Sequence, residues 1–193
     1  MRITGGEARG RRLFTTKAPG MRPTTDTARR TLFDILGDRV TGARALDLFA
    51  GAGTLGIEAL SRGASHVTFI EHDRDACAVI ERNLEAAGYS AVGTVVRSEV
   101  LRALARAPGS AADLVFVDPP YAAGLRFVSR VLQAVLAGSW VRPDGTVVVE
   151  ADAGEIELPV GLSEIRTRRF GRTQILIAVH DEGHKNSHLS GDV

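Results

Sequence analysis

The chain has 193 residues, of which 44% are hydrophobic, and a formal net charge of +1 at pH 7. This length suits one domain with a sizeable core, and the single cysteine, Cys77, excludes an internal disulfide. Because no apolar run is long enough to span a bilayer or serves as an N-terminal signal, we expect a cytoplasmic protein with no membrane partner.

The small net charge hides an asymmetry along the chain. Residues 1 to 44 hold ten Lys and Arg against four Asp and Glu, whereas the rest of the chain holds 14 against 19. A basic segment on a slightly acidic body is typical of phosphate binding. Arg9, Arg11 and Arg12 lie in a pattern that can form a two-stranded hairpin. We therefore predict that residues 1 to 25 form a basic arm that contacts RNA; a solvated charged face is the plainer alternative.

A helix is predicted directly after this arm. Apolar residues recur at helical spacing up to residue 36, Thr25 or Asp26 can cap the start, and Gly37 can end the helix. Arg29 and Arg30 belong to the polar side of this helix, so they are further candidates for contact with RNA.

Residues 44 to 56, with the sequence RALDLFAGAGTLG, predict a strand, a glycine turn and a helix over residues 54 to 60. Gly51 and Gly53 let the backbone approach a ligand closely, and the N–H groups at the helix start face that ligand. The next strand, residues 66 to 70, is followed by Glu71, where an acidic side chain can accept hydrogen bonds from ribose hydroxyls. This arrangement is typical of nucleoside binding.

The same glycines, together with Gly56, match the G-x-G-x-x-G pattern of nicotinamide dehydrogenases. Asp47 argues against that class, since a carboxylate four residues before the first glycine would repel a pyrophosphate. It suits a ligand with a cationic amino-acid end instead. Hydride transfer also does not require the second motif of the chain, Asp118-Pro119-Pro120-Tyr121.

The remainder of the chain alternates between helix and strand patterns. A turn at Pro143-Asp144-Gly145 precedes one strand, and Gly171 joins the last two strands into a hairpin. The predicted helices span residues 73 to 87, 99 to 107 and 125 to 136, and the predicted strands span residues 93 to 97, 114 to 117, 146 to 150, 164 to 170 and 174 to 179. Such alternation predicts an α/β fold with a parallel sheet and right-handed crossovers.

The second motif, Asp118-Pro119-Pro120-Tyr121, directly follows a buried strand and so lies at its carboxyl end, where open α/β sheets bind ligands. Asp118 and the carbonyl of Pro119 can accept the two hydrogens of an exocyclic amine on a base, while Tyr121 stacks on the ring. A base held in this way has left its stack. A proline-rich turn after a core strand, with Asp118 as a cap, is the structural alternative.

Taken together, the motifs resemble those of S-adenosylmethionine-dependent methyltransferases of exocyclic amines. With the N-terminal strings MRITGGEARGRRL and MRPTTDTARRTLFDIL, the chain is similar to the bacterial ribosomal RNA small-subunit methyltransferase D family of guanine-N2 methyltransferases, from Met1 to about Val179. The resemblance implies a Rossmann-like class I fold of seven strands with an antiparallel last strand. One departure is Ser98-Glu99-Val100, where relatives often have Asp or Asn followed by Ala.

The resemblance also implies ligands and roles. It implies S-adenosylmethionine as the cofactor, S-adenosylhomocysteine as the product, and 16S ribosomal RNA within a small subunit or its assembly intermediate as the partner of a monomeric enzyme. In the family, the stretch with Arg22 and Thr24 borders the active site, so we expect these two residues to orient the substrate. The implied catalytic residues are Asp118, Pro119, Pro120 and Tyr121, and the implied cofactor-binding residues are Asp47, Phe49, Ala50, Gly51, Gly53, Thr54, Glu71, His72, Glu99, Val100 and Asp118.

Three alternatives remain open at this stage. Methylation of adenine N6 or cytosine N4 in DNA uses the same four residues, a nucleic-acid-binding assembly protein could have lost catalysis, and an amine methyltransferase acting on small molecules or protein glutamine shares the motif. Cys77 follows alanine and does not resemble a cytosine-C5 nucleophile. Residues 26 to 180 are expected to form the catalytic domain, and residues 181 to 193 a disordered polar tail. We expect no metal site, since His184 and His188 in this tail are a poor ligand pair.

Overall fold

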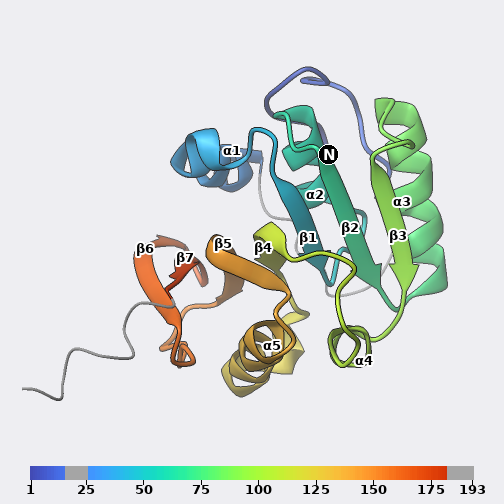
Figure 1. The fold of residues 1–193 in the computed structure, drawn as a ribbon. Helices are drawn as coiled ribbons and strands as arrows, with labels where there is room; N and C mark the ends of the chain where they lie inside the picture. The colour runs from blue at the N-terminus through green and yellow to red at the C-terminus, as the bar shows by residue number, and fades with distance from the viewer. Residues whose placement is uncertain (16–25, 182–193) are drawn as a thin grey trace, which may run out of the picture.

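The computed structural model describes residues 1–15 and 26–181, which form a seven-stranded sheet covered by helices on both faces (Figure 1). The strand order is β3-β2-β1-β4-β5-β7-β6, where β7 runs antiparallel to both neighbours and the other pairs are parallel. The strands are β1 (Arg44–Leu48), β2 (His66–Glu71), β3 (Gly93–Arg97), β4 (Ala112–Val117), β5 (Val141–Asp152), β6 (Leu162–Phe170) and β7 (Thr173–His180). The predicted α/β fold with an antiparallel last strand is thereby confirmed.

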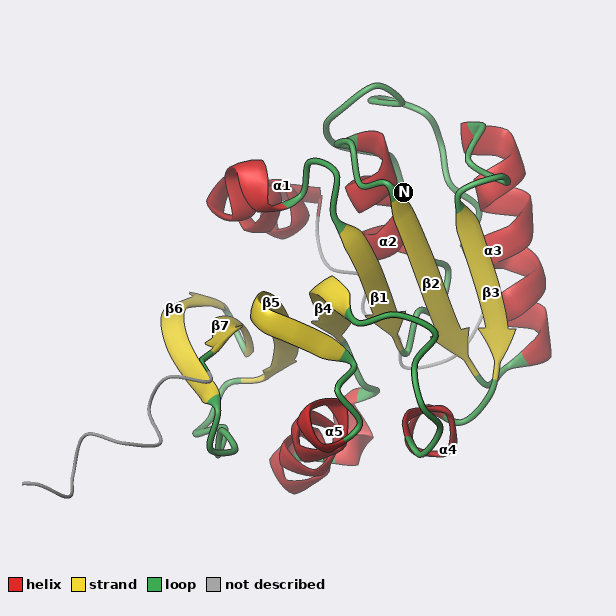
Figure 2. Ribbon diagram, in the orientation of Figure 1, coloured by secondary structure: helices red, strands yellow, loops and turns green. Residues whose placement is uncertain are grey.

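Helices lie on both faces of the sheet (Figure 2), and one apolar cluster on each face holds them to it. Helices α1 (Asp26–Leu36), α2 (Thr54–Ser61) and α3 (Arg74–Ala87) share one cluster, in which Phe33 of α1 meets Phe116 of β4 with ring centroids 5.8 Å apart. Helices α4 (Val100–Leu104) and α5 (Leu125–Ala137) share the other cluster. Two short 3-10 helices, η1 (Gly37–Arg39) and η2 (Tyr121–Ala123), complete the elements.

Local sequence explains where the helices beside the site begin and end. The Asp73 carboxylate accepts a hydrogen bond from the Ala76 N–H (2.7 Å) and so caps α3, and Gly88 ends this helix with φ at 82°. Helix α2 begins after Gly53, whose φ of 76° lies in the left-handed region. Both helix starts consequently lie next to the carboxyl ends of β1 and β2.

The N-terminal segment packs on the body of the domain. Ile3, Ala8 and Leu13 are buried in the cluster shared with α2 and α3. The predicted hairpin is present as an antiparallel bridge between Arg2 and Arg12, and three backbone hydrogen bonds join its arms: Ile3 N–H to the Arg11 carbonyl (3.0 Å), Gly10 N–H to the Ile3 carbonyl (2.9 Å) and Leu13 N–H to the Met1 carbonyl (3.0 Å). Backbone pairing within the segment and burial of these three apolar side chains against α2 and α3 therefore hold it in place.

Two elements differ most from the prediction, whereas the ends of the others differ by at most two residues. Helix α4 has five residues, shorter than the predicted 99 to 107. Strand β5 begins at Val141, before the predicted turn, because an Arg142–Asp113 ion pair (2.7 Å) keeps this stretch beside β4 across an irregularity in the register. Predictions for Arg22, Thr24, His184 and His188 lie outside the described residues. Within the described ranges, no helix is both long and apolar enough to cross a membrane.

Candidate functional site

The strand order reverses between β1 and β4, and the sequence motifs lie on both sides of this point. From β1 the chain continues to β2 and β3 on one side of β1, and then crosses to β4, which pairs with β1 on its other side. Asp47 lies in β1, and Asp118 directly follows β4, where its N–H reaches the Leu48 carbonyl at 3.5 Å. Ligands of open α/β sheets bind at such a switch point. The geometry therefore brings the two predicted motifs to one crevice.

The turn between β1 and α2 is tight and lies beside this crevice, with Gly51 and Gly53 buried. Phe49 has φ at 61° and Gly51 at 55°, and the Gly53 N–H donates to the Ala50 carbonyl (2.7 Å). Thr54 is the first residue of α2 and is half-buried. The Phe49 ring meets that of Phe127 edge-on, at 5.8 Å between centroids. Left-handed backbone at a non-glycine residue costs free energy, so packing must hold Phe49 in place.

Glu71, at the end of β2, is buried and organises the neighbouring loops. Its Oε2 accepts the Gly51 N–H (2.9 Å), while Oε1 accepts the N–H groups of His72 and Asp73 (both 2.8 Å) and lies 2.9 Å from His72 Nδ1. Each carboxylate oxygen has two acceptor positions, so Oε2 can accept one more donor. The carboxylate thus both fixes the glycine turn and can bind a hydroxyl.

Asp47 is 2% exposed, and its Oδ2 accepts the N–H of Gly56 in α2 (2.9 Å). Burial raises the pKa of Asp47 to about 7; the Gly56 hydrogen bond lowers this pKa, and the charge of Glu71 raises it further. A site with this electrostatics favours a cationic ligand over a pyrophosphate. Gly56 itself packs on the Phe69 ring, which leaves no room for a Cβ. The third glycine of the dehydrogenase-like pattern is thereby explained by close helix-to-strand packing.

The motif after β4 places a carboxylate at the mouth of the crevice. Asp118 is half-buried, Pro119 is buried and Pro120 is exposed, and the Pro120 carbonyl accepts the N–H of Ala123 in η2 (2.8 Å). Burial, then the charges of Glu150 and Asp47, raise the pKa of Asp118 well above its usual value. Tyr121 begins η2, but its side chain is outside the described part of the structure.

Glu99 and Val100 begin α4, next to the end of β2. The Ser98 N–H donates to the Glu71 carbonyl (2.9 Å), so the end of β3 is held beside Glu71. Glu99 is exposed and Val100 is buried. An apolar side chain and an exposed carboxylate therefore lie near Glu71, with β2 between them and the glycine turn.

Arg29 does not fit the predicted contact with RNA. Its side chain is fully buried, and it donates to Glu58 (3.3 Å), Asp26 (2.8 Å) and the Arg2 carbonyl. Glu58 in turn accepts the Thr4 N–H and hydroxyl (2.8 and 2.7 Å). The arginine therefore ties the N-terminal segment to α1 and α2, which the helical pattern alone could not reveal.

The other described arginines of the predicted arm differ in their contacts. Arg11 donates to the Ala86 and Ala87 carbonyls (3.3 and 2.8 Å) and so caps the end of α3. Arg9, Arg12 and Arg30 are exposed. These three remain candidates for phosphate contact, and Arg11 has a structural contact as well.

Sequence reasoning missed two residues at this edge of the sheet. Glu150 in β5 is 5% exposed and lies beside Asp118. Asn83 in α3 is fully buried, and its Nδ2 donates to the Ala52 carbonyl of the glycine turn (2.9 Å). An acidic residue near the end of a strand is the signal that identified Glu71, and the same signal would have found Glu150.

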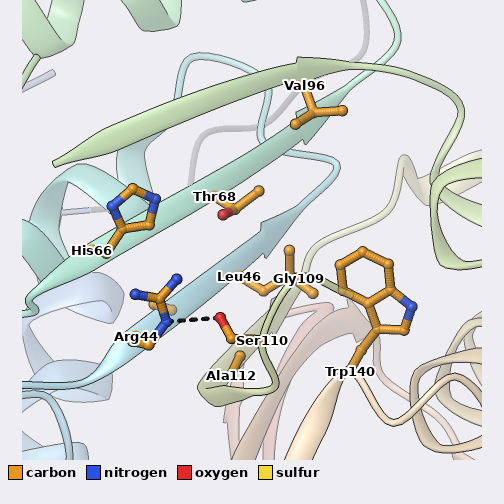
Figure 3. A pocket seen from close by; sticks show the side chains of 10 residues that line it. Arg44, Leu46, His66, Thr68, Val96, Gly109, Ser110, Ala112 and Trp140 are labelled. Carbon is orange, nitrogen blue, oxygen red and sulfur yellow. Dashed lines mark hydrogen bonds between the residues drawn. The ribbon is translucent and has the colours of Figure 1, made fainter. Parts of the chain in front are cut away.

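A separate cavity of about 460 Å³ lies along the first halves of the strands (Figure 3). Arg44, His66 and Trp140 line it, and the Arg44 Nε donates to the Ser110 hydroxyl (3.0 Å). None of the predicted site residues line this cavity. It is therefore distinct from the crevice at the carboxyl ends of β1 and β4.

Known proteins share both the sequence and the fold. The family model described as "Conserved hypothetical protein 95" matches residues 1–179. Ribosomal RNA small subunit methyltransferase D of Escherichia coli (strain K12) is 40% identical over 152 residues, 79% of this chain and 75% of that protein. YlbH of Bacillus subtilis (strain 168) is 34% identical over 182 residues, 92% of this chain and 97% of that protein.

Solved structures agree with these relatives. The structure of the Escherichia coli protein yhhF superposes with a TM-score of 0.83 at 35% identity and covers 94% of this chain and 98% of its own. A conserved hypothetical protein of Streptococcus pyogenes gives 0.72 at 33% identity, with 83% and 99% covered. With the matched family model and the relatives above, these similarities show that the chain belongs to the "Conserved hypothetical protein 95" family and is a methyltransferase related to ribosomal RNA small subunit methyltransferase D.

Proposed function

We propose that this methyltransferase modifies the exocyclic N2 of a guanine in 16S ribosomal RNA. The observation that carries the proposal is the position of Asp118-Pro119 across the switch point from Asp47 and the glycine turn. An amine acceptor and a cofactor crevice therefore lie on adjacent strands. An amine whose lone pair is delocalised into a ring reacts poorly, so it must be held and aimed.

The crevice fits S-adenosylmethionine, a cation with an amino-acid end and a nucleoside end. Asp47 and the backbone around Gly51 and Gly53 would hold the methionine end, since the buried carboxylate gains from a cation. Glu71 would accept the ribose hydroxyls. Phe49, Ala50, Thr54, His72, Glu99 and Val100 would line the remainder, with the last two beside the adenine. When bound, the cofactor supplies an activated methyl group.

The second half of the site would hold the base. Asp118 and the Pro119 carbonyl accept the two amine hydrogens, and Tyr121 stacks on the ring. Pro119 and Pro120 restrict the backbone, so the acceptors are preorganised before the base arrives. Catalysis then depends on positioning and exclusion of water, with Asp118 as a proton acceptor after methyl transfer.

Ribosomal RNA as the substrate is supported by the relatives' name and by the basic N-terminal segment. Arg9, Arg12 and Arg30 are exposed there and would contact phosphates, together with Arg11, Arg22 and Thr24. We further propose a cytoplasmic monomer that acts on a small subunit or its assembly intermediate.

Methyl transfer to three substrates tests the proposal. Labelled S-adenosylmethionine is incubated with the protein and with small subunits from a strain lacking the native enzyme, naked small-subunit RNA, or duplex DNA, and the product nucleosides are identified. We expect N2-methylguanosine on the subunits. Label only in DNA, as N6-methyladenine or N4-methylcytosine, would contradict the ribosomal substrate and favour the DNA alternative.

A further inference from the structure

Glu150 and Asp118 lie beside each other on one face of the sheet. The parallel register pairs Val117 with Val149, so the next residues, Asp118 and Glu150, are opposite each other on neighbouring strands. Side chains two positions apart in a strand share a face. Phe116 and Val148 belong to the apolar cluster of α1, α2 and α3, which places both carboxylates on that side.

The electrostatics of the site agree with this placement. Burial is the largest cause of the raised pKa of Asp118. The charge of Glu150 in β5 raises this pKa further, and the charge of Asp47 in β1 has a smaller effect in the same direction. Glu150 is 5% exposed, so water does not screen its charge well. The two oxygens of a carboxyl group provide several hydrogen-bond acceptor positions. The side chain therefore presents acceptors next to the residue that holds the amine.

The Watson–Crick edges of the bases differ in what they present beside their amino groups. Guanine carries the N1–H donor next to its N2 amine, whereas adenine and cytosine carry a ring-nitrogen acceptor next to their amines. A flipped base is recognised through this edge. A carboxylate at this position gains a hydrogen bond from guanine, but it meets a lone pair on adenine or cytosine. Sites that leave a buried polar group unpaired reject the wrong substrate strongly.

We propose that Glu150 selects guanine by accepting the N1–H of the base whose N2 amino group is held by Asp118 and Pro119. The inference rests on the proposed amine methylation and adds the source of its base specificity. Asp118 accepts from the reacting amine, whereas Glu150 accepts from the neighbouring ring nitrogen. Two adjacent strand ends would thus read two adjacent donors of one base.

The test exploits 2-aminopurine, which keeps the 2-amino group of guanine but has an acceptor at N1. The position of the methylated nucleotide is first mapped in the RNA, and RNA that carries either base at this position is then assembled into small subunits if they are required. For the wild-type protein we expect kcat/KM for 2-aminopurine to be about 100-fold below that for guanine. Glu150→Gln can donate its amide N–H to N1 of 2-aminopurine, so this ratio should approach or pass one.

Two controls separate the possible failures. S-adenosylmethionine affinity, measured by calorimetry, should be unchanged in Glu150→Gln, which also shows that the variant is folded. Glu150→Asp keeps an acceptor and should retain the preference for guanine at a lower rate. An unchanged ratio in Glu150→Gln, with N2-methylguanosine as the wild-type product, would overturn this inference alone. Methylation of adenine or cytosine by the wild type would overturn the proposed function as well.

Discussion

The side-chain amide of Asn83 forms hydrogen bonds with both backbone groups of Phe14. Its Oδ1 accepts the Phe14 N–H (2.7 Å), and its Nδ2 donates to the Phe14 carbonyl (3.0 Å) and to the Ala52 carbonyl in the glycine turn (2.9 Å). Arg82, the preceding residue of α3, lies over the Phe14 ring at 3.6 Å. One turn of α3 therefore joins the basic N-terminal segment to the cofactor crevice.

Asn83→Ala should lower both stability and cofactor affinity. The substitution removes partners from three backbone groups, and a buried unsatisfied group costs about 1–3 kcal/mol. We expect the free energy of unfolding to fall by about 3 kcal/mol, measured by urea denaturation, together with weaker S-adenosylmethionine binding. Glu85→Ala, on the exposed side of the same helix, is the control and should change neither quantity. Normal stability in Asn83→Ala would contradict this account.

Glu58→Ala should be strongly destabilising. This buried carboxylate accepts from Thr4, Arg29 and Arg62, and its loss leaves the fully buried Arg29 guanidinium without a main counter-charge. Breaking a buried ion pair in this way costs about 3–5 kcal/mol. Asp34→Ala removes the exposed partner of Arg62, 3.4 Å away, and should cost less than about 1 kcal/mol. Equal losses in the two variants would argue that burial of the ion pair has no effect.

Asp47 should make cofactor binding depend on pH. The carboxyl has a pKa of about 7 and must lose its proton to hold a cation, so affinity should fall about tenfold per pH unit below that value. Asp47→Asn should bind S-adenosylmethionine more weakly. Because the ligand titrates equally in both experiments, the difference between the affinity–pH curves of the wild type and the variant reports Asp47 alone. Calorimetry between pH 5.5 and 8.5 measures both. Parallel curves would rule out Asp47 as the titrating group.

The raised pKa of Asp47 also changes the stability of the ligand-free protein. Because the folded protein keeps the Asp47 proton that the unfolded chain loses, this residue makes the fold less stable as the pH rises from 3.8 to about 7. Asp47→Asn should reduce that decline in thermal unfolding experiments.

Asp118→Ala should abolish turnover while leaving S-adenosylmethionine binding measurable. Asp118 would accept a hydrogen bond from the amine, whereas Glu71 lies two strands away, with β1 between them. Loss of a positioned acceptor and proton acceptor is expected to lower kcat by at least about 100-fold. Single-turnover assays at saturating cofactor measure the chemical step. A variant that methylates at the normal rate would refute the assigned role.

Arg9 and Arg12 should contribute to RNA binding through charge. Replacing both by alanine, with Arg11 kept because it caps α3, should weaken binding and reduce the salt-dependence slope by about 1.5. Arg106→Ala with Arg130→Ala removes the same charge near α4 and on α5, and should leave the slope unchanged. Filter binding of RNA at a series of salt concentrations measures this slope. Equal slopes for both double variants would show that the N-terminal segment has no specific role.

Local patterns predicted most elements because each depends on neighbouring residues. The boundaries of β3, α3 and α5 follow from apolar periodicity and from Asp73 and Gly88, and they agree with the prediction to within a residue or so. Strand β5 begins earlier than predicted because its first residues are held by Asp113 in β4, which is remote in sequence. The N-terminal hairpin is paired as predicted, but its burial against α2 and α3 joins residues that are remote in sequence.

The sequence by itself determined the α/β class, the order of the elements and the motifs around Asp47, Glu71 and Asp118, since glycine, proline and strand-end carboxylates act through local geometry. Only the tertiary structure decided which side chains meet. Arg29 is buried against Glu58, and Glu150 lies next to Asp118, because helix packing and strand register bring together residues that are far apart along the chain. Charge type is visible in a sequence, but burial and pairing, which decide what a charge does, arise only when the sheet is assembled.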